Sequence, residues 1–251
     1  MATYVLVGGA FIGGWAWKHV ACTLRAQGHT VYPATLTGLG EREHLTSPDV
    51  NLDTHITDII NVMNYEDLNE VILVGHSYAG NVVGGVADRA AERLSQVVYL
   101  DSGPLVDGGA HIDFYPPAVR AGLQQQVDEL GEGWKLPFPG FEGLAQTASL
   151  AGLGESEREF MAAKVTAQPF NAYLQPLHLT SEYDGAYRRV AILCTDGGFS
   201  IAQFKDLVAA GEPAFQPFAA PDWQFHEIAT GHWPMLSTPV ELAALLEGLA
   251  V

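Results

Sequence analysis

The chain has 251 residues, with 12 Lys and Arg against 29 Asp and Glu, which gives a formal net charge of −17. This acidic balance excludes the basic surface that nucleic-acid-binding domains need, and it disfavours adhesion to anionic membranes. Hydrophobic residues make up 48% of the chain and charged residues 16%, a composition that excludes intrinsic disorder and fits one globular domain.

The first residues and the cysteine content indicate where the protein works. A short apolar run at residues 4–7 lies close to the N-terminus, without the basic start or the length of a signal peptide. No apolar stretch approaches the roughly 18 residues that a membrane span needs. Cys22 and Cys194 are too few for a secreted disulfide framework. We therefore expect a cytoplasmic protein without a membrane partner.

Short apolar runs rich in β-branched residues alternate along the chain with segments of helical periodicity. The predicted strands span residues 4–7, 31–36, 71–75, 97–101, 190–195 and 225–229. The predicted helices span residues 15–27, 53–66, 80–94, 201–210 and 240–249. Several strands are continuously apolar, as is typical of parallel strands covered on both faces. The alternation predicts an α/β fold with a mostly parallel, doubly wound sheet of about six strands.

The interval 104–186 interrupts this alternation. It is rich in proline and aromatic residues, and at about 80 residues it is too long for a plain connection. We predict an inserted, mostly helical cap at 104–186 on a core formed by residues 1–103 and 187–251. Because ligands of open α/β sheets bind at the carboxyl ends of the strands, the cap should roof an apolar pocket there. His111 and His178 lie in this interval. Contact with the substrate and a plain packing or surface role are both left open for these two side chains.

The strongest local pattern follows the third predicted strand, where residues 75–80 read GHSYAG. A strand that turns sharply into a helix holds the central side chain clear of the backbone, and the small residues Gly75, Ala79 and Gly80 permit such a turn. The Ser77 hydroxyl would then project in front of a helix N-terminus, as a catalytic nucleophile needs. The alternative is that Ser77 only caps the helix.

A serine nucleophile needs a histidine base and an acid that orients the histidine. His232 lies between the last predicted strand and the last predicted helix, which places it at the same edge of the sheet as Ser77. Two carboxylates, Asp196 and Asp101, lie at the carboxyl ends of predicted strands and follow Ser77 in the chain. From position alone, either acid is able to orient His232, and either is able to serve as a loop cap instead.

The carbonyl oxygen attacked by such a serine needs two N–H donors. Tyr78, directly after Ser77, should supply one, and the Gly-Gly-Ala-Phe loop at residues 8–11 the other, because glycines let the backbone approach an anion. These glycines are not spaced as in a dinucleotide-binding loop, and no His, Cys or carboxylate spacing is typical of a metal site. The sequence therefore predicts no cofactor and no metal.

Together these motifs resemble the α/β-hydrolases, and more narrowly the bacterial relatives of the plant methylesterase and hydroxynitrile lyase group. The resemblance spans nearly the whole chain. It rests on the first strand with its glycine loop and the WAW sequence at 15–17, and on LTGLGER at 36–42, GHSYAG at 75–80 and GHWPML at 231–236. It implies an α/β-hydrolase fold, with Ser77 as nucleophile, His232 as base, and Ala10 and Tyr78 as the oxyanion donors.

Three departures from the family pattern bear on the site. The His-Gly pair that usually follows the first strand is Gly8-Gly9 here, and Ala79 replaces a glycine. Gly197 occupies the position of the catalytic Asp, with Asp196 one residue earlier. We prefer Asp196 as the acid, because its strand corresponds to the acid-bearing strand of the family. Asp101 is the alternative, since other α/β-hydrolases carry the acid after the earlier strand; an incomplete triad is the third option.

The resemblance implies a serine hydrolase of the carboxylesterase type that acts on a small, largely apolar ester through a Ser-His-Asp mechanism. In the lyases of this group a Lys follows the catalytic His and a Thr lies near the first-strand loop, where this chain has Trp233 and Gly9. Because both lyase residues are absent, ester hydrolysis is preferred over hydroxynitrile or other carbon–carbon lyase activity, which is kept as the alternative. Thioesterase activity, lactonase activity and non-catalytic ligand binding are further alternatives. The expected partner is a small-molecule ester, and a homodimer is left open.

Overall fold

In a computed structural model that describes residues 1–180 and 185–250, six strands form one wholly parallel sheet. Their order is β2-β1-β3-β4-β7-β8. The bounds are β1 (Thr3–Val7), β2 (Thr30–Ala34), β3 (Val71–His76), β4 (Leu94–Leu100), β7 (Arg188–Cys194) and β8 (Trp223–Ile228). The predicted parallel sheet of about six strands is confirmed.

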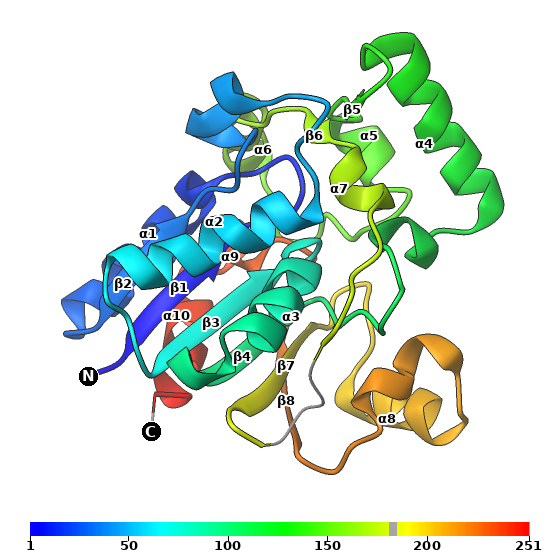
Figure 1. Ribbon diagram of the computed structural model, residues 1–251. Helices are drawn as coiled ribbons and strands as arrows, with labels where there is room; N and C mark the ends of the chain where they lie inside the picture. The colour runs from blue at the N-terminus through cyan, green and yellow to red at the C-terminus, as the bar shows by residue number, and fades with distance from the viewer. Residues whose placement is uncertain (181–184, 251) are drawn as a thin grey trace.

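Helices cover both faces of this sheet (Figure 1). On one face α1 (Lys18–Ala26) packs against α10 (Pro239–Gly248), and on the other α2 (Leu52–Tyr65) packs against α3 (Ala79–Arg89). Strand β3 is buried along its whole length because helices enclose it on both sides. This double cover explains why the strands read as continuous apolar runs in the sequence.

The remaining core elements lie around the sheet. The helices are α8 (Ile201–Ala209) and α9 (Pro234–Ser237), and the short 3-10 turns are η1 (Gly14–Trp17), η2 (Gly40–Leu45), η3 (Ala91–Arg93) and η5 (Pro213–Phe218). Two predicted helices are shorter than expected. The segment at 15–27 divides into η1 and α1, and the one at 80–94 ends at Arg89, after which the chain turns at Ala90 into η3 and β4.

Between β4 and β7, the elements from His111 to Leu174 lie beyond the carboxyl ends of the strands (Figure 1). They include η4 (His111–Phe114), α4 (Pro117–Leu130), α5 (Gly140–Leu144), α6 (Glu155–Ala162) and α7 (Asn171–Leu174). Within this segment, which the sequence predicts to be mostly helical, β5 (Lys135–Leu136) and β6 (Gln168–Pro169) form a short antiparallel pair. Residues 181–184 of the predicted cap lie outside the described residues.

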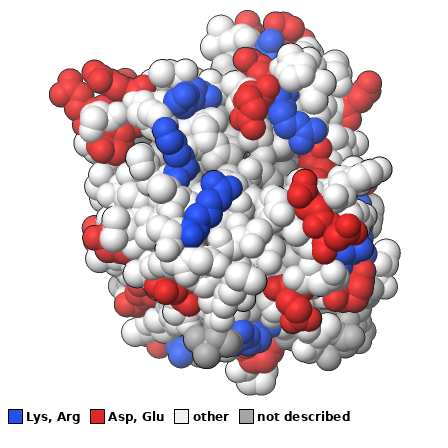
Figure 2. Space-filling model, turned by 90° about the vertical axis from the view of Figure 1, so that its left-hand side faces the viewer, with Lys and Arg blue, Asp and Glu red and all other residues white. Residues whose placement is uncertain are grey.

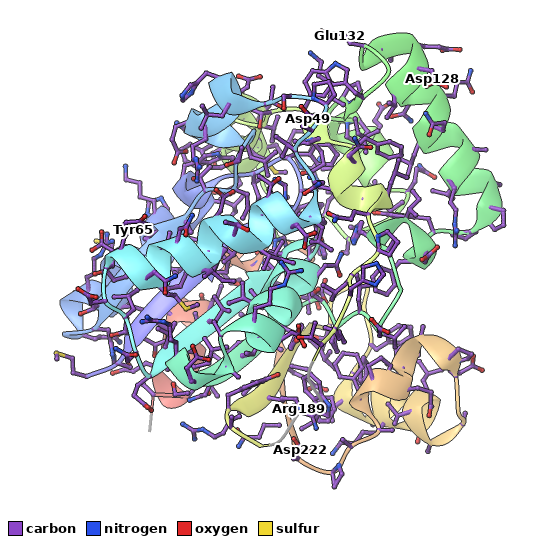
Figure 3. All side chains as sticks on the ribbon, viewed as in Figure 1. Asp49, Tyr65, Asp128, Glu132, Arg189 and Asp222 are labelled. Atoms are coloured by element: carbon purple, nitrogen blue, oxygen red, sulfur yellow. The ribbon has the colours of Figure 1, made fainter. Side chains whose placement is uncertain are left out.

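Charged side chains lie on the surface of the molecule (Figure 2 and Figure 3). At the opposite end of the sheet from α4, Arg189 and Asp222 lie side by side, with Arg189 Nε 2.9 Å from Asp222 Oδ2, whereas Asp128 lies on α4 (Figure 3). On the face drawn in Figure 2, acidic groups are scattered around a short row of basic groups that runs from the upper left to the centre.

Among the helices of residues 1–180 and 185–250, none combines the length and the apolar character needed to cross a bilayer.

Candidate active site

Ser77 lies in the sharp turn between β3 and α3. Its backbone φ is 53°, in the left-handed region that residues with a side chain rarely adopt. Two glycines make room for this turn: a Cβ atom on Gly75 would lie 2.7 Å from the Ala79 carbonyl oxygen, and one on Gly80 would lie 2.1 Å from Ser102 Oγ. The Ser102 hydroxyl also donates a hydrogen bond of 2.5 Å to the Ser77 carbonyl oxygen. Close packing around Gly75 and Gly80 and the hydrogen bond from Ser102 therefore hold the turn in place.

His232 follows β8 and reaches the same edge of the sheet. Its Nδ1 lies 2.5 Å from Oδ2 of Asp101, the residue directly after β4. The other carboxylate oxygen of Asp101 accepts a hydrogen bond of 3.2 Å from the Cys194 N–H. Because the carboxylate binds the proton of Nδ1, Nε2 of the neutral ring is left as the basic nitrogen. Ser77 and His232 line one cavity, as a nucleophile and its base must.

Asp196, the acid preferred from the sequence, is not the partner of His232 in this structure. Its side chain is exposed, and its backbone N–H donates to the Thr230 carbonyl oxygen at 3.1 Å. The reason is the strand order: β4 lies directly beside β3, whereas β7 is one strand farther from Ser77. The expectation of an Asp196–His232 contact is therefore corrected in favour of the alternative, Asp101.

The environment of Asp101 keeps its carboxyl group ionised. Burial by itself would raise the pKa of Asp101, but the hydrogen bond from His232, the charge on that ring and the Cys194 N–H outweigh burial and lower the pKa. A carboxylate that stays negative at neutral pH stabilises the imidazolium that forms when His232 takes a proton.

His76, the residue before Ser77, supports the loop of His232. The His76 Nε2–H donates a hydrogen bond of 2.6 Å to the His232 carbonyl oxygen, and the two ring centroids are 4.7 Å apart. Burial and the nearby charge of His232 lower the pKa of His76 to about 3, so this ring stays neutral. On its other side, a Cβ atom on Gly9 would lie 2.9 Å from His76 Nδ1, so only glycine fits there without displacement.

The loop after β1 carries the second expected oxyanion donor. Ala10 lines the same cavity as Ser77. In the loops and turns of residues 1–180 and 185–250, no backbone hydrogen bond uses the N–H of Ala10 or of Tyr78. Both N–H groups are therefore uncommitted to other loops, as the donors of an oxyanion hole need to be.

The segment between β4 and β7 braces both loops of the site. Phe11 has a left-handed φ of 66°; its N–H donates to Gln168 Oε1 at 3.4 Å, and its carbonyl oxygen accepts from the Thr166 N–H at 3.0 Å. On the other side, the His232 N–H donates to the Ser149 carbonyl oxygen at 2.9 Å. These contacts hold the backbone of the loop after β1 and of the His232 loop in place.

A buried network behind the site holds Tyr78. The Tyr78 hydroxyl donates to Nδ1 of His55, in α2, at 2.8 Å, and His55 Nε2–H donates to the Thr37 carbonyl oxygen at 2.9 Å. These directions follow because a carbonyl oxygen only accepts. Asp58 in turn accepts hydrogen bonds from the N–H and the hydroxyl of Thr37, at 2.7 and 2.8 Å. Burial lowers the pKa of His55 to about 4, so its ring is neutral in the folded protein.

This neutral ring makes stability depend on pH. The pKa of His55 is about 4 when folded and about 6.5 when unfolded, so its contribution to stability is complete above pH 6.5 and is lost as the pH falls toward 4. Between pH 7.5 and 5.5, His55 should lower the free energy of unfolding by about 1.4 kcal/mol. We expect His55→Gln to flatten the pH dependence by this amount in urea unfolding. His178→Gln, at an exposed position, is the control, and an unchanged slope in His55→Gln would contradict a neutral buried ring.

Two adjoining cavities meet at Ser77. The first, of about 370 Å³, is mostly apolar and is also bordered by Trp233, and the second, of about 490 Å³, is bordered by Asn81 and Asp101. Side chains of the segment between β4 and β7, Val119 among them, line both. Of the described residues around these cavities, none is Lys or Arg, and the described chain holds no group of three His, Cys, Asp or Glu suited to a metal ion.

The supporting residues His76, Thr166 and Gln168 were missed by the sequence analysis. His76 carried a signal, because a polar residue at the end of an otherwise apolar buried strand must find a hydrogen-bond partner. Thr166 and Gln168 carry none, since they lie far from Ser77 in the chain and belong to no motif. The predicted positions of Ser77, His232, Ala10 and Tyr78 come together at one edge of the sheet.

Comparisons with known proteins agree with the fold and show the family of the chain. Residues 4–245 match the model of a family described as the alpha/beta hydrolase family. A carbendazim hydrolyzing esterase of Nocardioides sp. (strain SG-4G) is 34% identical over 251 residues, which cover 99% of this chain and 100% of that protein. Methylesterase 10 of Arabidopsis thaliana is 27% identical, with 98% of this chain and 91% of that protein covered. Among solved structures, an extracellular alpha/beta-hydrolase of a Paenibacillus species superposes with a TM-score of 0.82 at 20% identity, covering 100% of this chain and 99% of that one.

Proposed function

The chain belongs to the alpha/beta hydrolase family, and from this premise we propose that it is a carboxylesterase-type serine hydrolase of small, largely apolar esters. The observation that carries the proposal is the His232–Asp101 pair next to Ser77. His232 lines the mostly apolar cavity together with Ser77, and Asp101 lines the adjoining cavity that Ser77 also borders. A carboxylate that fixes Nδ1 of a histidine beside a serine in a strained turn is the arrangement that activates a hydroxyl for acyl transfer.

In the proposed mechanism the Ser77 Oγ attacks the ester carbonyl carbon while His232 Nε2 takes the hydroxyl proton. Asp101 holds the ring and stabilises its positive charge, and the N–H groups of Ala10 and Tyr78 stabilise the negative oxygen of the tetrahedral intermediate. His232 returns the proton to the leaving alcohol, which leaves an acyl group on Ser77. Water, activated by the same histidine, then releases the acid and restores the enzyme.

The side chains that line the two cavities favour ester hydrolysis over cyanohydrin cleavage. A leaving cyanide ion needs a nearby positive charge, and in the lyases of the similar group a Lys follows the catalytic histidine. Here that position is Trp233, whose indole offers a neutral donor at most, and no Lys or Arg occurs among the described residues that line the two cavities. Gly9 likewise offers no hydroxyl.

The segment 104–186 acts in this proposal as the cap that encloses the acyl or alcohol part of the substrate. Its contacts to both catalytic loops, through Thr166, Gln168 and Ser149, support such a role. The curated relatives are named for methyl esters and for carbendazim, so these compounds belong in the substrate panel. A cytoplasmic location and a homodimer stay predictions from the sequence.

A substrate panel tests the proposal. We expect turnover of p-nitrophenyl acetate or butyrate, or of a methyl ester or carbendazim, and no cyanide release from mandelonitrile by the same preparation. Thioesters and lactones in the panel distinguish the related activities. Cyanide release without ester turnover would assign the lyase reaction instead. No turnover together with ligand binding would indicate a non-catalytic relative.

A further inference from the structure

A histidine outside the proposed triad lies on the wall of the active site. His111, the first residue of η4, is only 9% exposed, and it borders both of the cavities that meet at Ser77. The proposed ester hydrolysis gives this ring no proton to carry. A buried imidazole that faces a ligand cavity is nevertheless a strong hydrogen-bonding group, so its donor and acceptor atoms decide what it can bind.

The hydrogen bonds of His111 define which ring nitrogen carries the proton. Asn81 Nδ2 lies 2.7 Å from His111 Nδ1. Because an amide NH₂ group only donates, Nδ1 accepts and the proton resides on Nε2. Burial lowers the pKa of His111 to about 3, so the ring is neutral at any working pH. The ring therefore presents one neutral N–H donor, at Nε2.

Within the described chain this Nε2–H group makes a long hydrogen bond. The Tyr115 hydroxyl lies 3.5 Å from Nε2, at the outer limit for such a bond. A buried donor that is poorly satisfied costs free energy, which a closer acceptor would recover. Since His111 borders both cavities, a bound ligand is the group placed to supply that acceptor.

The ring is fixed relative to the proposed nucleophile. Its centroid lies 5.3 Å from that of Tyr78, the residue after Ser77, in an edge-to-face contact, and 4.2 Å from that of Tyr173. Asn81, which orients His111, lies one helical turn after Ser77 in α3. A donor held at a constant distance from the reacting atom discriminates between substrates by where their acceptors lie.

We infer that His111, oriented by Asn81, is a specificity-determining residue whose Nε2–H binds an uncharged hydrogen-bond acceptor on the substrate. A ring nitrogen or a second carbonyl oxygen close to the scissile ester has this chemistry. The inference rests on the proposed ester hydrolysis at Ser77, because it concerns the substrate of that same site. Esters with such an acceptor are preferred over wholly apolar esters of equal size.

The test measures binding without turnover. In a Ser77→Ala background, calorimetry gives the Kd of methyl benzoate and of the methyl esters of the three pyridinecarboxylic acids, which share one size and differ in the place of one acceptor. His111→Phe keeps an aromatic ring and removes the donor. We expect it to reduce the preference for at least one pyridine ester over benzoate by about tenfold, the size expected for one buried hydrogen bond. A change of less than threefold for all three isomers overturns the inference.

Two further variants make the result specific. His178→Phe makes the same replacement at an exposed position of the same chain segment and should leave the three Kd ratios unchanged. Asn81→Leu removes the group that fixes the proton on Nε2, so it should reduce the preference for the same isomer. It also tests the inference if His111→Phe does not fold. Absence of ester turnover in the wild-type protein would refute the proposed function, yet it would leave these Kd ratios measurable.

Discussion

Ser77→Ala is expected to lower kcat for the best ester of the panel by at least about 10³-fold, the order of loss when a member of such a triad is removed. The variant loses only the hydroxyl oxygen, and alanine keeps the Cβ atom in the left-handed turn, so the fold should be retained. Substrate binding should change little, because most of the cavity wall is untouched. Circular dichroism and thermal unfolding establish the fold, and initial rates give kcat.

A covalent probe and a matched serine complete this test. A fluorophosphonate should label the wild-type protein at Ser77, as identified by peptide mass spectrometry, and should not label Ser77→Ala. Ser156→Ala removes the same atom from an exposed serine of α6 and should leave kcat unchanged. Turnover of Ser77→Ala near the wild-type rate would end the serine-hydrolase proposal.

Asp101→Asn is expected to lower kcat by about 10³- to 10⁴-fold. The amide keeps the size of the carboxyl group, but it has no negative charge to stabilise the imidazolium of His232. If its NH₂ group faces Nδ1, it also forces the proton onto Nε2, the nitrogen that must act as the base. The measurement is kcat for the same ester, with the fold verified by thermal unfolding.

Asp196→Asn is the matched control for the acid. It makes the same chemical change at an exposed carboxylate on the neighbouring loop and should leave kcat within about twofold of the wild type, as is usual for surface substitutions away from the reacting groups. The reverse result, with Asp196→Asn severely impaired and Asp101→Asn active, would restore Asp196 as the acid. If both variants kept full activity, neither carboxylate would orient His232 and the proposed triad would be wrong.

The fold and two of the three proposed triad members could be predicted from the amino-acid sequence. Continuous apolar strands that alternate with amphipathic helices already specify a parallel sheet covered on both faces, because each pattern reports local burial. Ser77 is recognisable because the turn that carries it needs tiny neighbours at positions 75, 79 and 80. His232 is recognisable because the loop after the last strand must end at the same edge of the sheet.

The contact of Asp101, rather than Asp196, with His232 follows from how the strands are arranged in space. Both residues lie at the carboxyl ends of strands, and the local sequence pattern does not show which of these strands lies beside β3. The sheet order places β4 there, so Asp101 receives the Nδ1–H of His232 while Asp196 faces solvent.

The same limit applies to the groups that support the site and face its cavity. Gln168 binds Phe11, and Asn81 binds His111, across long stretches of intervening chain. No local pattern encodes such contacts, because they arise from where the segment between β4 and β7 packs against the rest of the chain. Local sequence specifies the helices, the strands and the turn that carries Ser77. The packing of distant segments selects the carboxylate that contacts His232, holds the loops in place and sets the hydrogen-bonding character of the pocket.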